Sequence, residues 1–116
     1  PVYVFRTPEY ASLDAPPETA WESVRGLSTS FGYKANDPER LDGAALIRLL
    51  VEVVSKGGNL LVGVGPDGRG RIVDAERNAL LALGDWLRVN GEAIYGTRAW
   101  TRAEGLAADG REVRFP

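Results

Sequence analysis

Residues 59–70 read NLLVGVGPDGRG, an apolar run over 59–64 that ends in a turn rich in glycine and proline. A continuous apolar run bounded by glycines is typical of a strand buried on both faces, as in parallel sheets covered by helices. Pro66, Asp67 and Gly68 supply turn chemistry: a fixed φ, a side chain that bonds the local backbone, and a residue free to adopt a positive φ. The stretch therefore predicts a buried strand followed by a tight turn.

An amphipathic helix is predicted on each side of this strand. Upstream, Asp42 is suited to cap the N-terminus of a helix over residues 43–56, in which apolar residues recur at helical spacing, and Gly57 is suited to end it. Downstream, Asp74 is suited to cap a second amphipathic helix over residues 75–90, with Gly91 past its end. Helices on both sides of a buried strand predict an α/β fold.

Further β-structure is expected near both ends of the chain. The β-branched and aromatic residues of Val2–Phe5 and Trp21–Val24 predict short strands, and alternation over residues 111–115 predicts a β element after a turn at Asp109-Gly110. Alternating strands and helices with short connections argue for βα units and a parallel sheet. Two such units cannot cover both faces of a parallel sheet or protect its edges. We therefore expect this chain to be a segment of a larger α/β protein.

The composition excludes several kinds of chemistry and of partner. The 116 residues contain no Cys and no His, so disulfides, thiolates and the commonest general base are absent, and acid–base chemistry must rest on carboxylates. The formal charge is −2 with scattered basic residues, so no nucleic acid partner is expected. The apolar runs are far shorter than a bilayer span, so no membrane partner is expected. No signal peptide is visible, and the compartment and a homo-oligomeric state stay open.

Two glycine-rich stretches raise the alternative of a nucleotide site. Gly63, Gly65 and Gly68 match G-x-G-x-x-G, but that fingerprint requires the glycines to open a helix, and the next helical pattern begins only near Asp74. The stretch SKGGN at 55–59 lacks the order of a phosphate-binding loop and is typical of a helix end. A small nucleotide-binding domain is therefore disfavoured.

Four strings carry a resemblance to a known family. In order and spacing, these strings resemble the later part of the catalytic domain of the α-L-fucosidases, glycoside hydrolase family 29. They are FRTPEY, WESVRGLSTSFGY, LIRLLVEVVSKGGNLLVGVGP and DWLRVNGEAIYGTRAW. The resemblance covers nearly all of residues 1–100. It implies that residues 1–100 are the last βα units of a (β/α)8-like TIM barrel. It also implies that residues 101–116 begin a C-terminal β-sandwich domain.

The resemblance also implies a reaction. Family members hydrolyse terminal α-L-fucosyl linkages of glycans by a retaining mechanism that uses two carboxyl groups and no metal or organic cofactor. Glu9 in TPEY matches the general acid/base of the bacterial enzymes. The motifs that hold the nucleophilic Asp and the sugar-binding His residues are absent from these residues. We therefore expect the chain to be inactive without the remainder of the barrel, which would lie on the same or a separate chain.

Three further residues are candidates for contact with the fucosylated glycan. Phe31 in SFGY matches an aromatic that lines the pocket for the C6 methyl group of fucose. Trp21 and Glu22 are candidate substrate-binding residues, with the alternative that the indole packs beneath the site and the carboxylate is held by local hydrogen bonds. Gly63 stands where the family usually has Asn, so no site role is extended to residues 63–65. A non-catalytic carbohydrate-binding or barrel-completing subunit stays open as a second function.

Overall fold

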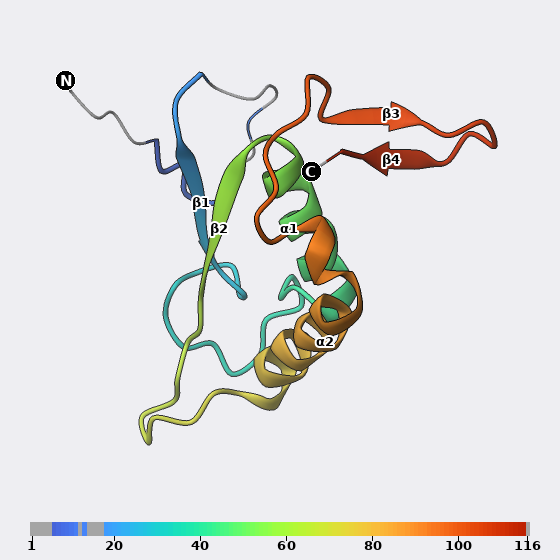
Figure 1. Cartoon of the computed structure of the whole chain (residues 1–116). Coiled ribbons are helices and arrows are strands. Elements are labelled where there is room, and N and C mark those ends of the chain that lie inside the picture. Colours follow the sequence, from blue (N-terminus) through green and yellow to red (C-terminus); the bar gives the residue numbers. More distant parts are fainter. Residues whose placement is uncertain (1–5, 12, 14–17, 116) are drawn as a thin grey trace.

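The computed structural model describes residues 6–11, 13 and 18–115, and the strand predicted at Val2–Phe5 lies outside them. The elements follow in the order β1 (Trp21–Gly26), α1 (Gly43–Ser55), β2 (Gly58–Gly63), α2 (Asp74–Asn90), the 3-10 helix η1 (Gly91–Ala93), β3 (Glu104–Leu106) and β4 (Glu112–Arg114) (Figure 1). The mixed α/β arrangement agrees with the expectation from the sequence.

β1 and β2 form the predicted parallel pair. Their register runs from Trp21 opposite Gly58 to Gly26 opposite Gly63. Residues 6–10 continue the sheet on the other edge of β1, since the β1 backbone exchanges hydrogen bonds with that segment through Glu22 and Val24, and the bridges are parallel. Three backbone segments that are separate in sequence thus run side by side in one direction.

The two faces of this small sheet have different surroundings. On one face Leu60 and Val62 pack against a buried core formed by Leu27, Leu46 and Ala79. On the other face, which carries Asn59, Leu61 and Gly63 by strand alternation, Leu61 is 51% exposed. We call this second side the open face. The strand predicted at 59–64 is therefore present as β2, and the described part of the chain covers mainly one of its faces.

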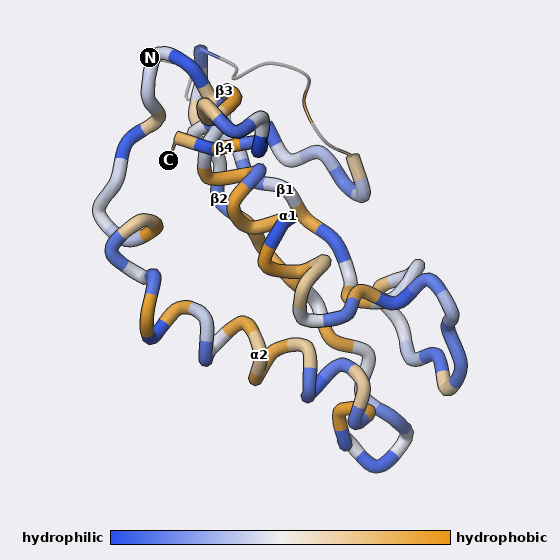
Figure 2. Tube along the Cα trace, turned by 90° about the vertical axis from the view of Figure 1, so that its right-hand side faces the viewer, coloured by the Kyte–Doolittle hydropathy of each residue, from blue (hydrophilic) through white to orange (hydrophobic). Residues whose placement is uncertain are grey.

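Helix α1 lies between the sheet and α2, and its boundaries follow the predicted signals. The Asp42 carboxylate accepts a 2.7 Å hydrogen bond from the backbone amide of Ala45, as an N-cap does. Gly57 follows the helix with φ of 73°, a left-handed conformation in which glycine avoids the Cβ clash. α1 contacts both β2 and α2, and Figure 2 shows hydrophobic residues along much of its length.

Helix α2 departs from the prediction at both ends. Asp74 is its first residue instead of its cap, and Val73 at the N-cap position makes no side-chain cap bond. Gly91 has a right-handed φ of −58°, because the chain continues into η1. In the turn before α2 the residue with positive φ is Gly70, at 76°, and not Gly68. The predicted turn is therefore present, but Gly68 does not use its freedom to adopt a positive φ.

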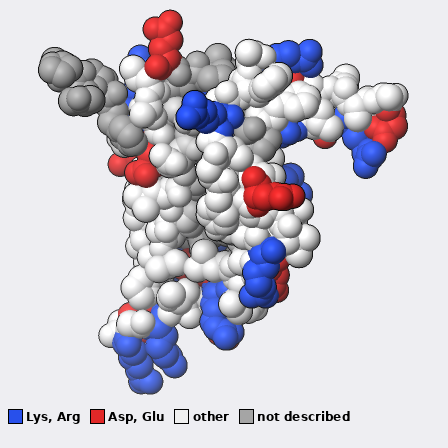
Figure 3. Space-filling view, viewed as in Figure 1, with Lys and Arg blue, Asp and Glu red and all other residues white. Residues whose placement is uncertain are grey.

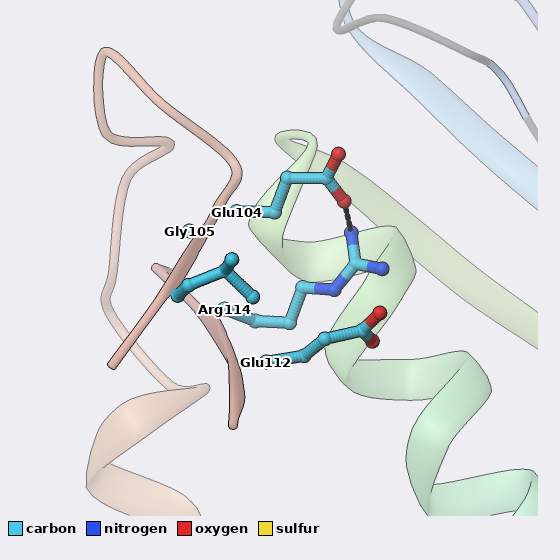
Figure 4. A pocket seen from close by; sticks show the side chains of 5 residues that line it. Glu104, Gly105, Glu112 and Arg114 are labelled. Atoms are coloured by element: carbon cyan, nitrogen blue, oxygen red, sulfur yellow. Dashed lines mark ion pairs between the residues drawn. The ribbon is translucent and has the colours of Figure 1, made fainter. Parts of the chain in front are cut away.

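The last described residues form an antiparallel hairpin of β3 and β4, which projects beside α1 in Figure 1. Gly110 has φ of 83° at the predicted turn, and β4 corresponds to the β element expected at 111–115. β3 was not predicted from the sequence. A hollow of about 200 Å³ lies on the hairpin, and Figure 4 shows Arg114 of β4 paired there with Glu104 of β3, at 2.5 Å. Arg114 is the only cationic side chain among the described residues that line the hollow, and it is paired with Glu104 within the hairpin.

Candidate functional site

The carboxyl ends of the parallel segments meet at one edge of the sheet. Gly26 and Gly63 are register partners at this edge, and the loops 27–42 and 64–73 leave from it, at the lower end of the molecule in Figure 1. In α/β proteins with parallel strands, ligand sites are built by loops at this end of the sheet. We call it the carboxyl edge and treat it as the candidate site.

Phe31 lies at the carboxyl edge, over the open face. Its Cδ1 atom is 3.5 Å from the point where a Cβ on Gly63 would stand. Its ring also meets the ring of Tyr10 edge to face, with centroids 5.1 Å apart, and the side chain is 43% exposed. The structure thus brings Phe31 together with the end of β2 and with the residue that follows Glu9. An aromatic ring that is held on two sides and open on a third can serve as a pocket wall.

Tyr10 fixes the backbone directly after Glu9. It adopts φ of 50°, an uncommon conformation for a residue with a side chain, and its hydroxyl oxygen accepts a 3.0 Å hydrogen bond from the Gly26 amide. The Arg25 guanidinium lies 5.2 Å from the centre of the ring. Such backbone strain persists only where the surroundings enforce it, and it clusters at functional sites. Tyr10 was not predicted as a functional residue from the sequence, although Tyr10 lies within the TPEY string.

Glu9 itself is exposed and forms a parallel bridge with Val24 of β1. Its backbone is therefore tied to the sheet two residues before the end of β1, while its side chain remains accessible to a ligand. Glu9 thus presents an exposed carboxylate close to the end of β1.

The loop that carries Phe31 is closed by Asp37. Its carboxylate accepts hydrogen bonds of 2.8 Å from both the amide and the hydroxyl of Thr29, and one of 3.1 Å from the amide of Glu39. These donors, the Thr29 amide first, lower the pKa of Asp37 from 3.8 to about 2. An ionised carboxylate thus holds the loop together on both sides of Phe31.

Trp21 and Glu22 lie at the opposite end of β1. The Trp21 indole is 2% exposed, faces α1 and donates a 2.9 Å hydrogen bond to the Lys56 carbonyl. Glu22 points to the open face by alternation, beside its register partner Asn59. With a rise of about 3.3 Å per residue, Trp21 is about 16 Å from the end of β1. The structure therefore does not bring these two residues to Phe31, and their contact with substrate stays a prediction.

The glycine motif belongs to a self-contained turn. Asp67 accepts side-chain hydrogen bonds of 2.8 Å and 2.9 Å from the backbone amides of Arg69 and Arg71, and these amides, that of Arg71 first, lower its pKa. Gly63 ends β2, and α2 begins only at Asp74. The glycines therefore do not present amides from a helix N-terminus, which agrees with the argument against a dinucleotide site.

A buried carboxylate that the sequence reading missed lies behind the carboxyl edge. Glu76, in the first turn of α2, is 1% exposed and contacts both Gly65 and Arg40. The burial of Glu76 could not be predicted from the local sequence, because an acidic residue in the first turn of a helix is ordinarily solvated and the partners of Glu76 come from other loops.

The distribution of charge, the acidic side chains and the helix lengths bear on other kinds of functional site. Figure 3 shows Lys and Arg side chains gathered at the lower end of the molecule, while the central surface carries few charges. Within the described residues no group of three or more Asp or Glu side chains is placed to hold a metal ion. No helix in the same part of the chain is long and apolar enough to cross a membrane.

Parallel βα units with loops at the carboxyl edge place the chain in the α/β class, in which ligand sites commonly lie at strand ends. The sequence model of the family described as α-L-fucosidase matches residues 2–92. The chain belongs to the α-L-fucosidase family.

Individual relatives agree with this assignment. The chain is 42% identical over 94 residues to an α-L-fucosidase of Branchiostoma floridae, which covers 74% of this chain and 21% of that protein. It resembles the Thermotoga maritima α-fucosidase solved in complex with fucose, with a TM-score of 0.82 and 46% identity over 95% of this chain and 25% of the other. It also resembles α-L-fucosidase isoenzyme 1 from Paenibacillus thiaminolyticus, with a TM-score of 0.81 and 32% identity over 95% of this chain and 27% of the other. The chain thus spans about a quarter or less of the length of these relatives.

Proposed function

We propose that this chain is the closing part of the catalytic barrel of a retaining α-L-fucosidase, which hydrolyses terminal α-L-fucosyl linkages of glycans. The observation that carries the proposal is the likeness, over 95% of the chain, to an α-fucosidase solved with fucose. The placement of Glu9 and Phe31 near one sheet edge supports it, since a sugar hydrolase needs a carboxylate and a pocket wall at the same mouth.

The proposed fold is the last βα units of a (β/α)8-like barrel, followed by the start of a β-sandwich at residues 101–116. The open face supports a barrel, because its exposed Leu61 would then point into a packed interior. β2 pairs only with β1 in the described residues, so its other edge is available to a strand supplied from elsewhere. The β3–β4 hairpin would be the first part of the sandwich.

Glu9 is proposed as the general acid/base. In the first step it protonates the departing glycosidic oxygen while an Asp from the remainder of the barrel attacks the anomeric carbon and forms a glycosyl-enzyme intermediate. In the second step Glu9 takes a proton from the water that hydrolyses this intermediate. The exposed carboxylate next to the constrained Tyr10 is consistent with this role. The nucleophilic Asp is proposed to lie in the remainder of the barrel, so this chain is proposed to be inactive alone.

Phe31 is proposed as the wall that contacts the C6 methyl group of the sugar. Fucose is a 6-deoxy sugar, so an apolar wall favours its methyl group over the hydroxymethyl group of an ordinary hexose. The ring is exposed on one side, as such contact requires. Glu22, on the open face, remains a proposed sugar contact, and Trp21 is proposed to act from beneath the sheet by packing.

The proposal is tested by combining this chain with a polypeptide that carries the upstream part of the barrel. We expect cleavage of an aryl α-L-fucoside by the mixture and by neither part alone. Binding of fucose without turnover, with every component folded, would instead favour the alternative of a non-catalytic carbohydrate-binding or barrel-completing subunit. The matched control is the same mixture with an aryl α-D-glucoside, which we expect to remain uncleaved.

A further inference from the structure

The buried carboxylate of Glu76 joins two loops of the carboxyl edge. Its Oε2 atom accepts a 3.0 Å hydrogen bond from the backbone amide of Gly65, in the loop after β2. Its Oε1 atom lies 3.5 Å from Nε of Arg40, in the loop after β1, and the two side chains are 1% and 10% exposed. A carboxylate removed from water in this way is stable only while both partners are present, so it holds the two loops together.

Gly65 stands where these loops touch. A Cβ on this residue would lie 2.7 Å from the carbonyl oxygen of Gly32 and 3.0 Å from Cα of Tyr33. Both neighbours are backbone atoms, which cannot rotate away as a flexible side chain would. Gly32 and Tyr33 directly follow Phe31, so the close approach at Gly65 decides how near the Phe31 segment lies to the end of β2.

Arg40 extends the connection to the far side of the same loop. Besides its ion pair with Glu76, its Nη2 atom donates a hydrogen bond to the carbonyl of Lys34. The loop that carries Phe31 is therefore held by direct contact with Gly65 on one side and by the guanidinium on the other. Two of these contacts, from the Gly65 amide and from the Arg40 guanidinium, meet at Glu76, whose side chain is 1% exposed and therefore out of reach of a substrate.

We propose that Gly65, Glu76 and Arg40 are positioning residues that set how closely Phe31 lines the pocket, and thereby determine selectivity at carbon 6 of the sugar. The inference rests on the proposed fucosidase function and adds residues that act through Phe31. Displacement of the loop would widen the pocket at the methyl group. A 6-hydroxylated sugar would then be rejected less strongly, while the reacting groups at the anomeric carbon remain in place.

The test compares Gly65→Ala with Gly68→Ala in the reassembled enzyme. Gly68 lies in the same loop, and nothing stands within 4 Å of its Cβ position. The readout is the ratio of kcat/KM for an aryl α-L-fucoside to that for the matching α-L-galactoside, which differs only in bearing a hydroxymethyl group. This ratio does not depend on the concentration of folded enzyme, so a loss of stability alone leaves it unchanged.

We expect Gly65→Ala to lower the ratio about tenfold, the scale on which one displaced pocket contact alters discrimination, and Gly68→Ala to leave it within about twofold. A second variant, Glu76→Gln, keeps the size of the side chain but removes the charge that faces Arg40, and we expect it to lower the ratio in the same direction. Glu92→Gln, at an exposed carboxylate after α2, is its control.

Two outcomes overturn the inference in distinguishable ways. If Gly65→Ala and Glu76→Gln reduce activity on both sugars equally, the ratio is unchanged, the three residues serve stability only, and the fucosidase function stands. If the wild-type mixture cleaves neither sugar although every component is folded, the fucosidase function fails and the inference fails with it.

Discussion

The indole nitrogen of Trp21 donates a 2.9 Å hydrogen bond to the backbone carbonyl of Lys56, and so joins the first residue of β1 to the end of α1. The ring is 2% exposed. It also fills the space beside Gly58, where a Cβ would lie 2.4 Å from a ring atom. The sheet and the helix layer are therefore locked together at the amino end of the strands.

Trp21→Phe tests this link. The phenyl ring keeps most of the apolar contact but leaves the buried Lys56 carbonyl without its donor, which should lower the free energy of unfolding by about 1–3 kcal/mol. The measurement is the urea midpoint of the reassembled barrel. Trp100→Phe, at a position 65% exposed, should change it little. Equal effects of the two substitutions would contradict a specific role for the indole.

Glu9→Ala tests the proposed acid/base. Loss of proton donation should slow a substrate with a poor leaving group by about 10²–10⁴-fold, while an activated aryl fucoside should be affected much less. Azide, which needs no proton removed, should partly restore turnover. The measurement is a series of aryl fucosides of graded leaving-group pKa. A small effect of the same size on every substrate would mean that the proton comes from another residue.

Asp37→Asn tests the carboxylate that closes the Phe31 loop. The pKa of Asp37 in the folded protein is about 2, below its ordinary value of 3.8, so its contribution to stability is present above pH 4 and is lost as the pH falls toward 2. The variant should therefore unfold more easily at neutral pH, and the difference from the wild type should vanish near pH 2. Urea midpoints between pH 2 and pH 6 measure this. Asp85→Asn, at an exposed ion pair, should show no such convergence.

Asp42→Ala and Asp74→Ala compare two acidic residues at helix starts. Only Asp42 makes a side-chain bond to its helix, so its removal should lower stability by about 1 kcal/mol. Asp74 makes no cap bond and contributes through the helix dipole alone, about 0.3–1 kcal/mol at low salt. Raising the ionic strength should shrink the effect of Asp74→Ala and leave most of that of Asp42→Ala. If the stability losses of both variants were equally sensitive to salt, this would argue against a capping hydrogen bond from Asp42.

Leu61→Lys tests the open face. Leu61 and Leu81 are both 51% exposed, but Leu61 lies on the open face of β2 and Leu81 lies on helix α2. If the open face is covered by the remainder of a barrel, Leu61→Lys buries an unpaired ammonium and should prevent reassembly. Leu81→Lys should permit it. Size-exclusion chromatography of the mixed parts measures assembly, and equal assembly of both variants would show that the open face remains in solvent.

The helices could be predicted because their signals are local, whereas the parallel pair was inferred from the alternation of strands and helices along the chain. The apolar spacing of α1, the cap at Asp42 and the glycine at 57 act within a few residues of one another. By contrast, α2 has acidic residues in its first turn that look alike in sequence, and only the fold distinguishes the solvated Asp74 from the buried Glu76. Within the turn, the Asp67 amide donates a hydrogen bond to the Arg71 carbonyl and the Gly70 amide donates one to the Asp67 carbonyl, and this closure gives Gly70 the positive φ.

The candidate site could be predicted only in part. Glu9 and Phe31 were found through the resemblance of the strings around them, and their roles stay proposals. The residues that hold them were missed, because Tyr10 acts through a bond to Gly26 that lies 16 positions away, and Arg40 meets Glu76 from another loop. Contacts of this kind depend on which loops the sheet brings together, so local sequence patterns do not predict them.

The contact between the Trp21 ring and Gly58 also constrains how the two positions can change during evolution. Any larger residue at position 58 requires the indole to move, and a smaller residue at position 21 leaves space beside position 58 that a side chain there could enter. We therefore expect the two positions to be coupled, so that related sequences with a larger residue at position 58 carry a smaller one at position 21.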